Sequence, residues 1–290
     1  MAKENGGILK WMAEYDRRYV YLALFLVMVG PLLRPIGMPI SVSPDTRQYY
    51  GILQQVQPGD KVFFTLNTEF SGYNEIQSGI IATMRVLVEK NARVCFGVAH
   101  VEATVIPELI IKAVQAEMDA NDYQYGRDYI ILGYIFPNEA AVAAGAQDFH
   151  GVVTQDWLGR PIAGTFLDEI DDWEDWDLIA DFTTGIATSY LINHYALRGT
   201  PMIMNCIGVM IASEKPYLDS GVLLALLQSM RGGAELEFLI GHPGPGLTAM
   251  DAFSFGHYML IVFIIIGNVG YFGYTKQQQM KLAKEGSTNG

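Results

Sequence analysis

Several polar side chains follow short apolar runs of this sequence. Among them are acidic and basic residues that could act together in catalysis. His100 comes after one such run, Glu69 follows a second, and Asp181 lies within a third. A carboxylate beside an imidazole fixes the tautomer of the ring and raises its basicity, so such a pair could serve in acid–base catalysis. The candidate ligand-binding residues are Asn67, Thr68, Glu69, His100, Glu102, Asn138, Glu139, Asp181 and Thr183.

The same residue types also have a structural interpretation. Asn, Asp and Thr side chains usually cap helices and satisfy turns at such places, which is the favoured interpretation of these positions, and catalytic residues remain unassigned. The sequence contains no G-x-G-x-x-G after a strand, no Walker A loop, no G-x-S-x-G and no H-E-x-x-H. This disfavours a nucleotide enzyme, a serine hydrolase of the usual kind and a zinc protease, and no cofactor is predicted.

The most acidic stretch of the chain is residues 168–181. Calcium is the ion to consider there, because it takes about six to eight oxygen ligands, and Asp171, Asp172, Asp175 and Asp177 are weak candidates. However, no glycine stands at the turn position that an EF-hand needs. A solvated acidic loop is the favoured interpretation.

Cys95 and Cys206 are the only cysteines. Two cysteines exclude a disulfide framework and a four-cysteine zinc site. Both fall in predicted strands, where free cysteine is usually a buried, inert thiol. A single bridge between them requires neighbouring strands, which the sequence leaves open.

Strands and helices alternate in the central part of the chain. Strands are predicted at residues 61–66, 93–98, 129–132, 151–154, 178–182 and 201–207, and helices at residues 76–90, 107–121, 138–147, 186–198 and 218–240, the last broken at Gly232 and Gly233. Continuous apolar strands interleaved with helices indicate an α/β fold with a mostly parallel, Rossmann-like open sheet and helices on both faces. The carboxyl ends of its strands, where ligands bind in such sheets, carry the polar residues named first.

Both ends of the chain predict membrane helices. Residues 252–275 carry no formal charge and are long enough to cross a bilayer. Residues 19–40 form a shorter candidate, uncharged only to residue 33, for which a cleaved signal peptide is the competing interpretation. Lysine and arginine in residues 1–18 and 276–290 indicate two cytoplasmic tails, so a single domain over residues 41–246 is expected outside the cytoplasm, in a two-pass protein of the cell membrane.

The second predicted span carries two polar residues on one face. His257 and Asn268 lie 11 positions apart, which at 100° per residue places them about 20° from each other around the helix. Gly267 and Gly270 add small positions that allow close helix approach. Because polar side chains facing lipid are costly, this face predicts an intramembrane interface.

The charge of the chain limits the classes of partner that it is expected to bind. Its formal net charge is −12, without a basic cluster that could bind phosphates, so nucleic acid is excluded as an expected partner. The expected partners are membrane lipid and either further copies of this chain or another integral-membrane subunit.

Four segments together carry a family resemblance. They are YGRDYIILGY (125–134), LIADFTTG (178–185), YLDSGVLLALLQSMRGGAELE (217–237) and MDAFSFGHYMLIVFIIIGNVGYF (250–272). In combination the chain resembles an uncharacterised prokaryotic family of membrane proteins with a transmembrane helix at each end and an α/β domain between. The resemblance implies that architecture and assigns no activity or catalytic residue.

Two functional hypotheses follow. The first is a membrane-anchored α/β domain acting as a structural or binding subunit, or scaffold, of an oligomeric membrane complex. The second is a membrane-anchored hydrolase or transferase that uses the polar cluster at the strand carboxyl ends. Hydrogen bonds among Glu69, His100 and Asp181 around a cleft would favour the enzyme.

Overall fold

The computed structural model describes residues 7–34, 36–185 and 187–288. The chain forms two compact units. One consists of Pro39–Leu247, and the other combines Met1–Met38 with Thr248–Gly290.

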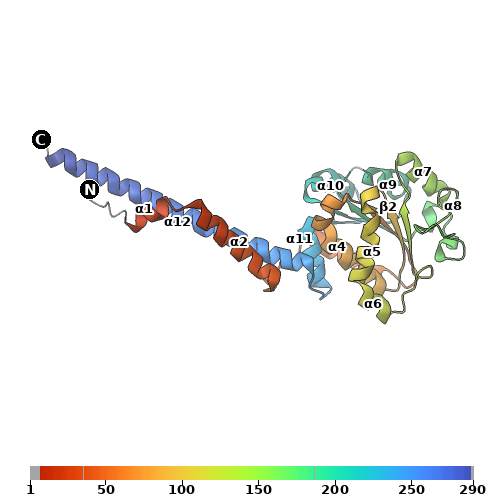
Figure 1. Ribbon diagram of the computed structural model, residues 1–290. Helices are drawn as coiled ribbons and strands as arrows, with labels where there is room; N and C mark the ends of the chain where they lie inside the picture. Colours follow the sequence, from red (N-terminus) through yellow and green to blue (C-terminus); the bar gives the residue numbers. More distant parts are fainter. Residues whose placement is uncertain (1–6, 35, 186, 289–290) are drawn as a thin grey trace. The chain divides into compact units, whose positions relative to one another are not determined.

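The first unit is built on a six-stranded sheet in which every neighbouring pair of strands is parallel (Figure 1). The strands are β1 (Lys61–Asn67), β2 (Arg93–Val98), β3 (Tyr129–Tyr134), β4 (Leu178–Thr183), β5 (Met202–Cys206) and β6 (Ala225–Gln228). Their order across the sheet is β3-β2-β1-β4-β5-β6. The predicted α/β fold with a parallel, Rossmann-like sheet is therefore confirmed.

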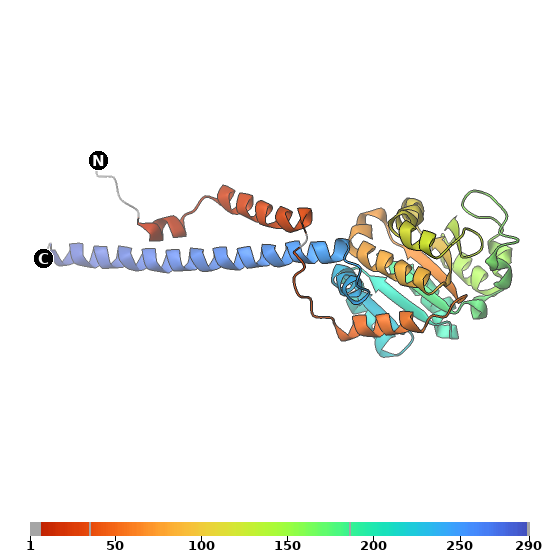
Figure 2. The same ribbon diagram turned by 90° about the horizontal axis from the view of Figure 1, so that it is seen from below.

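Helices cover both faces of this sheet (Figure 2). The α-helices of the unit are α3 (Pro44–Gln55), α4 (Phe70–Glu89), α5 (Ile106–Ala113), α6 (Gln115–Ala120), α7 (Glu139–Gln147), α8 (Phe149–Val152), α9 (Thr188–His194), α10 (Ile211–Asp219) and α11 (Ser229–Leu239). Short 3-10 turns are η1 (Val101–Val105), η2 (Phe166–Glu169), η3 (Trp173–Asp175), η4 (Ala196–Arg198) and η5 (Gly208–Met210). Side chains of α3 to α6 and α11 enter the core on one face, and those of α7 to α9 enter the core on the other.

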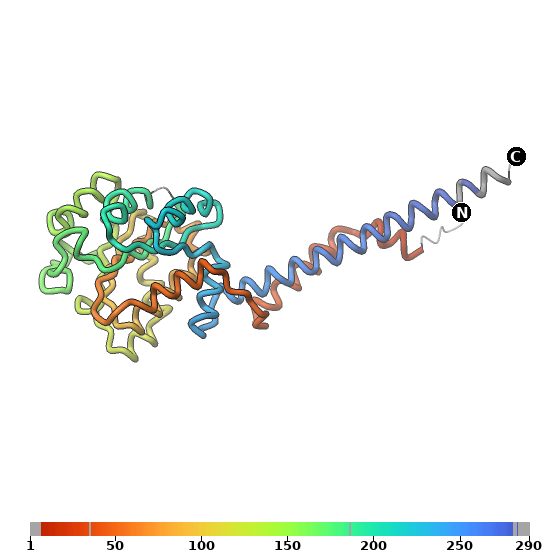
Figure 3. Tube along the Cα trace, turned by 180° about the vertical axis from the view of Figure 1, so that it is seen from behind, coloured from red at the N-terminus to blue at the C-terminus, as the bar shows by residue number. Residues whose placement is uncertain are grey.

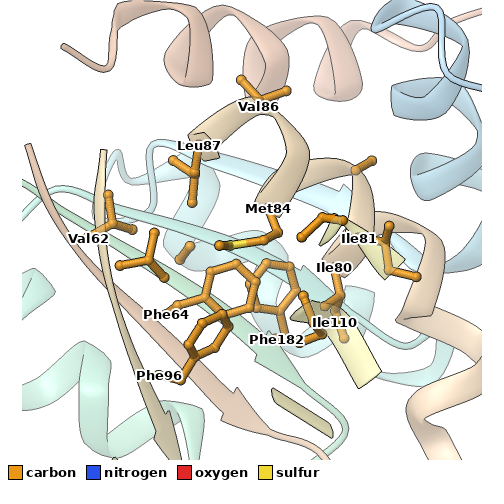
Figure 4. Packing of buried hydrophobic residues seen from close by; sticks show 14 of the residues in the cluster. Val62, Phe64, Ile80, Ile81, Met84, Val86, Leu87, Phe96, Ile110 and Phe182 are labelled. Carbon is orange, nitrogen blue, oxygen red and sulfur yellow. The ribbon is translucent and has the colours of Figure 1, made fainter. Parts of the chain in front are cut away.

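The alternation of side chains along β1 divides the core into these two halves. Phe64 stacks on Phe182 with ring centres 4.4 Å apart, in the cluster beneath α4 (Figure 4). Phe63 points to the opposite face and stacks on Trp176 at 4.8 Å. Successive strand residues face opposite sides, so an apolar run such as that of β1 fits a strand buried on both faces.

Two sequence predictions about secondary structure were wrong. Residues 218–240 do not form one helix, because α10 ends at Asp219, Gly221 turns the chain with φ +78°, and β6 follows. Residues 151–154 do not form a strand, since α8 runs through Val152. In both places the apolar residues fit either period, and tertiary contacts decide.

Glycine is required where α11 crosses α4. A side chain at Gly233 would collide with Ser78 and come within 2.6 Å of the backbone nitrogen of Gly79. The glycine pair at positions 232 and 233 therefore permits close packing of two helices, and α11 continues through it unbroken.

Glu237 holds the segment that leads into the last helix, α12 (Pro245–Thr288). Its buried carboxylate accepts hydrogen bonds from the backbone nitrogens of Gly244, Gly246 and Leu247, at 3.1, 3.1 and 2.8 Å. The backbone of this proline- and glycine-rich segment, residues 244–247, is thus held locally by the Glu237 carboxylate.

The second unit contains α1 (Ile8–Ala13), α2 (Arg17–Leu33) and most of α12. The segment Pro245–Met280 of α12 is, among the described residues, the one helix long and apolar enough to cross a membrane. Helix α2 has only 17 residues and ends before Arg34, so the predicted N-terminal span over residues 19–40 is not confirmed as a continuous helix.

The N-terminal helices run beside α12 (Figure 3). A side chain at Gly256 would touch Met28 of α2, whereas one at Gly270 would collide with the backbone of Met12 in α1. Between these levels the Tyr15 hydroxyl donates to the carbonyl of Phe263 at 3.1 Å. Helix α2 therefore packs against only the first half of the uncharged stretch of α12, and α1 packs against the second half.

Asp251 fastens the end of this helical pair. Its carboxylate accepts hydrogen bonds from the backbone nitrogens of Ile36, Gly37 and Met38, at 2.8 to 2.9 Å. The extended residues 36–38, which follow α2, are thereby hydrogen-bonded to α12.

Candidate functional site

The strand order creates one topological switch point. From β1 the chain builds outward through β2 to β3, and then returns to place β4 on the other side of β1. In open α/β sheets ligands bind at the carboxyl ends of the strands that flank such a point. A ligand site is therefore expected at the carboxyl ends of β1 and β4.

Asp181 of β4 lies at this point, fully buried. In the sheet register it stands opposite Thr65 of β1. The Thr65 hydroxyl and the Asn67 side-chain amide each donate to Oδ1 of Asp181 at 2.6 Å, and the Thr188 hydroxyl of α9 donates to Oδ2 at 2.7 Å. Two strands and a helix thus converge on one carboxylate.

Burial raises the pKa of Asp181 to about 7, because an ionised carboxylate loses its hydration there. The negative charge of Glu214 raises the pKa further, while the three donated hydrogen bonds stabilise the charged form and lower it. Burial also raises the pKa of Glu214 itself. The site therefore holds an acid that titrates near neutral pH, which is unusual for a carboxyl group.

The space beside this cluster is small. A cavity of about 10 Å³ adjoins Thr65 and Asn67 and is closed by Phe136, Tyr190 and Leu191. That volume holds about one water molecule. The Asp181 cluster consequently resembles a packed polar core more than an open substrate cleft.

The loop residues after β1 and β4 are held by local turns. Thr68 donates to the carbonyl of Glu69 at 2.9 Å, and Thr183 donates to the carbonyl of Gly185 at 2.9 Å. The Glu69 carboxylate is exposed, and its backbone nitrogen donates to the Thr184 hydroxyl at 2.9 Å. These contacts join the two loops through structural hydrogen bonds.

The described residues do not form the predicted acid–base pair. The hydrogen bonds of Asp181 within the described part of the chain come from Thr65, Asn67 and Thr188, and not from His100 or Glu69. Nε2 of His100 is buried without a hydrogen-bond partner among the described residues, and Glu102 is exposed in the first turn of η1. The contacts that would favour an enzyme are thus missing from the described structure.

Asn138 and Glu139 have the structural role that was the alternative prediction. Asn138 caps α7, where its Oδ1 accepts from the backbone nitrogen of Ala141 at 3.1 Å. Glu139 is exposed and contacts Nε2 of His194 at 3.2 Å. Both residues lie outside the Asp181 cluster.

The acidic stretch forms backbone caps. Asp172 and Asp175 make a capping box around η3, and Asp177 accepts from the backbone nitrogen of Lys61 at 2.8 Å. Asp171 is exposed. No group of three His, Cys, Asp or Glu side chains in the described residues could hold a metal ion, so these four aspartates do not assemble a calcium site there.

Cys95 and Cys206 are both free and buried. Burial raises the pKa of each thiol. Because a thiolate is the reactive form, both are inert core thiols.

Two larger cavities lie away from the switch point. One of about 570 Å³ is lined by Arg93, Arg127 and Arg160, and one of about 430 Å³ by Tyr129 and Trp157 among others. Each of the three arginines already contacts a carboxylate within 3.2 Å. The cationic lining of the larger cavity is therefore neutralised by the chain itself.

The predicted intramembrane residues separate into two faces. Gly267 and Gly270 face the N-terminal segment, where side chains would meet Tyr15 and Met12. His257 and Asn268 are exposed, on a part of α12 that α1 and α2 leave uncovered. Nδ1 of His257 contacts the carbonyl of Phe253 at 2.7 Å, and Asn268 has no hydrogen-bond partner among the described residues.

The sequence analysis missed Thr65, Thr188 and Glu214 as members of the candidate site. Thr65 gave a usable signal, since it is the polar residue inside the apolar run of β1. Thr188 and Glu214 lie on helices, and only the folded structure brings them toward Asp181.

Comparisons with known proteins found one weak structural similarity. No protein-family model matches the chain, and no curated protein matches it. One solved structure, a trehalose-6-phosphate synthase, is similar with a TM-score of 0.32 at 11% identity, covering 87% of this chain. The chain spans about half (49%) of the length of that protein. A likeness this weak carries no argument about function, and the resemblance to a membrane-protein family stays a prediction.

Proposed function

We propose that this protein is a membrane-anchored α/β domain that acts as a structural or binding subunit of an oligomeric membrane complex. The observation that carries the proposal is the exposed polar pair, His257 and Asn268, on a helix long and apolar enough to span a membrane. Polar side chains in hydrocarbon are costly unless another protein surface covers them. Oligomerisation, or a further integral-membrane subunit, would supply that surface.

The proposed topology has two passes, with both termini in the cytoplasm and the α/β unit outside. Helix α12 forms one pass. The other contains α2 within residues 19–40, because α2 alone rises only about 25 Å against a hydrocarbon layer of about 30 Å and needs flanking residues to complete the pass. Exposed Arg17 and Arg18 then belong to the cytoplasmic tail, beside the start of the pass.

The Asp181 cluster supports a structural or binding role over hydrolysis. Thr65, Asn67 and Thr188, the donors at the carboxylate in the described structure, are already engaged with it, and the adjoining cavity holds about one water molecule. A substrate would have to displace these contacts before reacting. We therefore assign Asp181 to fixing β1, β4 and α9 together.

The test is an accessibility experiment combined with a mass measurement. A protease cleavage site inserted after Asp148, which is exposed, should be cut from outside in intact spheroplasts, whereas tags at either terminus should be cut only after lysis. In mild detergent the full chain should migrate as a particle larger than one copy. Protection of the Asp148 site in intact cells would overturn the topology, and a monodisperse single copy extracted from native membranes would overturn the role as a complex subunit.

A further inference from the structure

A heptad pattern runs along the uncovered face of α12. His257, Ile261, Ile264, Asn268 and Tyr271 are spaced 4, 3, 4 and 3 residues apart, which is the spacing of a two-helix contact seam. All five are exposed, with 52% of Ile261, 61% of Ile264 and 61% of Tyr271 accessible. We call these five residues the α12 seam.

The seam is distinct from the face that packs on the chain's own N-terminal helices. At 100° per residue its centre lies about 110° around the helix from the centre of Gly256, Gly267 and Gly270. One helix can therefore pack against α1 and α2 on one side while its seam stays available to a further helix.

Asn268 indicates which helix packs against the α12 seam. It stands at an a position of the heptad, between Ile264 and Tyr271 at d positions. In a parallel pair of identical helices an a residue faces its own copy, and a side-chain amide both donates and accepts, so two Asn268 amides satisfy each other. Any two copies in one membrane with the same topology have parallel α12 helices. An unrelated helix would need its own polar group at the same depth.

His257 is compatible with this arrangement. Its Nδ1 contacts the Phe253 carbonyl, which can only accept, so Nδ1 carries a proton and Nε2 remains an acceptor in the neutral ring. The seam contains no lysine, arginine, aspartate or glutamate that would repel its copy.

We propose that α12 pairs in parallel with α12 of a second copy of this chain through the α12 seam, with the Asn268 amides hydrogen-bonded across the pair. The inference rests on the proposed function, because it requires α12 to lie in a membrane, and it names the partner that the proposed function leaves open.

The test is disulfide cross-linking of the full chain in native membranes. Cys95 and Cys206 are buried in strands of the α/β unit, so the unaltered chain gives the background. Ile261→Cys and Ile264→Cys place a thiol on the seam, whereas Val262→Cys and Val269→Cys are matched controls that are exposed to a similar degree on another face. Oxidation should give at least several-fold more covalent dimer for the seam variants than for the controls. Equal dimer yields on and off the seam, or none above background, would overturn the proposal.

A second measurement uses the association constant. Asn268→Leu keeps the helix apolar but removes the amide pair, so self-association in mild detergent should weaken about 3- to 30-fold. Ile264→Leu should change it less than about twofold. A wild-type particle that contains a different membrane protein and shows no seam cross-link would overturn this inference and leave the proposed function standing, whereas a lone monomer without cross-links would overturn both.

Discussion

Replacing Asp181 by asparagine should flatten the pH dependence of the stability of the α/β unit. Burial raises the pKa of this carboxyl from its ordinary value of 3.8 to about 7. Between these values the folded chain holds a proton that the unfolded chain has lost. A folded state that binds more protons loses stability as the pH rises, so the contribution of Asp181 to the free energy of unfolding decreases from about pH 4 to pH 7.

The size of the effect follows from the two pKa values. Their separation of about three pH units corresponds to about 4 kcal/mol, since each unit is worth about 1.4 kcal/mol. Between pH 5 and pH 8 the contribution of Asp181 to the free energy of unfolding changes by about 3 kcal/mol. The rest of the change falls below pH 5, where the carboxyl of the unfolded chain ionises. For a unit of this size that is a change of about 6–12 °C in Tm.

The assay is thermal unfolding of the full chain, followed by tryptophan fluorescence at pH 5 and pH 8. Asparagine cannot ionise and can still accept from Thr65 and Asn67, so the Tm of the variant relative to wild type should rise by about 6–12 °C between the two pH values. Other titrating groups cancel in this difference. Asp171→Asn, an exposed matched change, should leave the difference near zero. An equal Tm difference for Asp181→Asn at both pH values would refute the assignment of a raised pKa.

Three further predictions concern packing and hydrogen bonds. Thr188→Val keeps the shape of the side chain but removes the bond to Oδ2 of Asp181, and should lower the free energy of unfolding by about 1–3 kcal/mol at pH 8 and by less at pH 5, as measured by urea titration. Gly233→Ala should lower the free energy of unfolding by about 1–3 kcal/mol, because the added methyl group collides with the backbone of α4. Gly51→Ala, in open space on α3, should raise the free energy of unfolding by about 0.5–1 kcal/mol. The reverse order in thermal unfolding would contradict the described crossing of α4 and α11. Glu237→Ala removes the acceptor of the Gly246 and Leu247 backbone nitrogens, so amide hydrogen exchange there should accelerate at least tenfold. Unchanged exchange would show that this carboxylate does not hold residues 244–247.

Much of the fold could be predicted because the relevant signals are local. The apolar runs of β1, β2, β4 and β5 are short and bounded by turns, and their alternation with amphipathic helices requires a parallel sheet. β6 was missed because Ala225–Gln228 belongs to a longer apolar stretch that also fits a helical period.

The candidate site was predicted in part for the same reason. Asn67 and Asp181 meet because both belong to strands whose carboxyl ends share one edge of the sheet. Thr188 could not be predicted, since its contact depends on how α9 returns over that edge. The failed pairing of His100 with Asp181 shows that a common edge does not place loop side chains within hydrogen-bond distance.

The position of β4 beside β1 has a consequence for how the protein is made. Leu178 follows Asn67 by roughly 110 residues, yet the two strands are neighbours in the sheet. At a synthesis rate of about 5–20 residues per second, β4 is made about 5–20 s after β1. Until then the backbone groups of β1 that pair with β4 have no partner strand. During this interval β1 is an open, strongly apolar edge that could pair with the β1 of another nascent chain. A chaperone that binds extended apolar segments would therefore protect this edge of the chain after β3 has emerged and before β4 follows it.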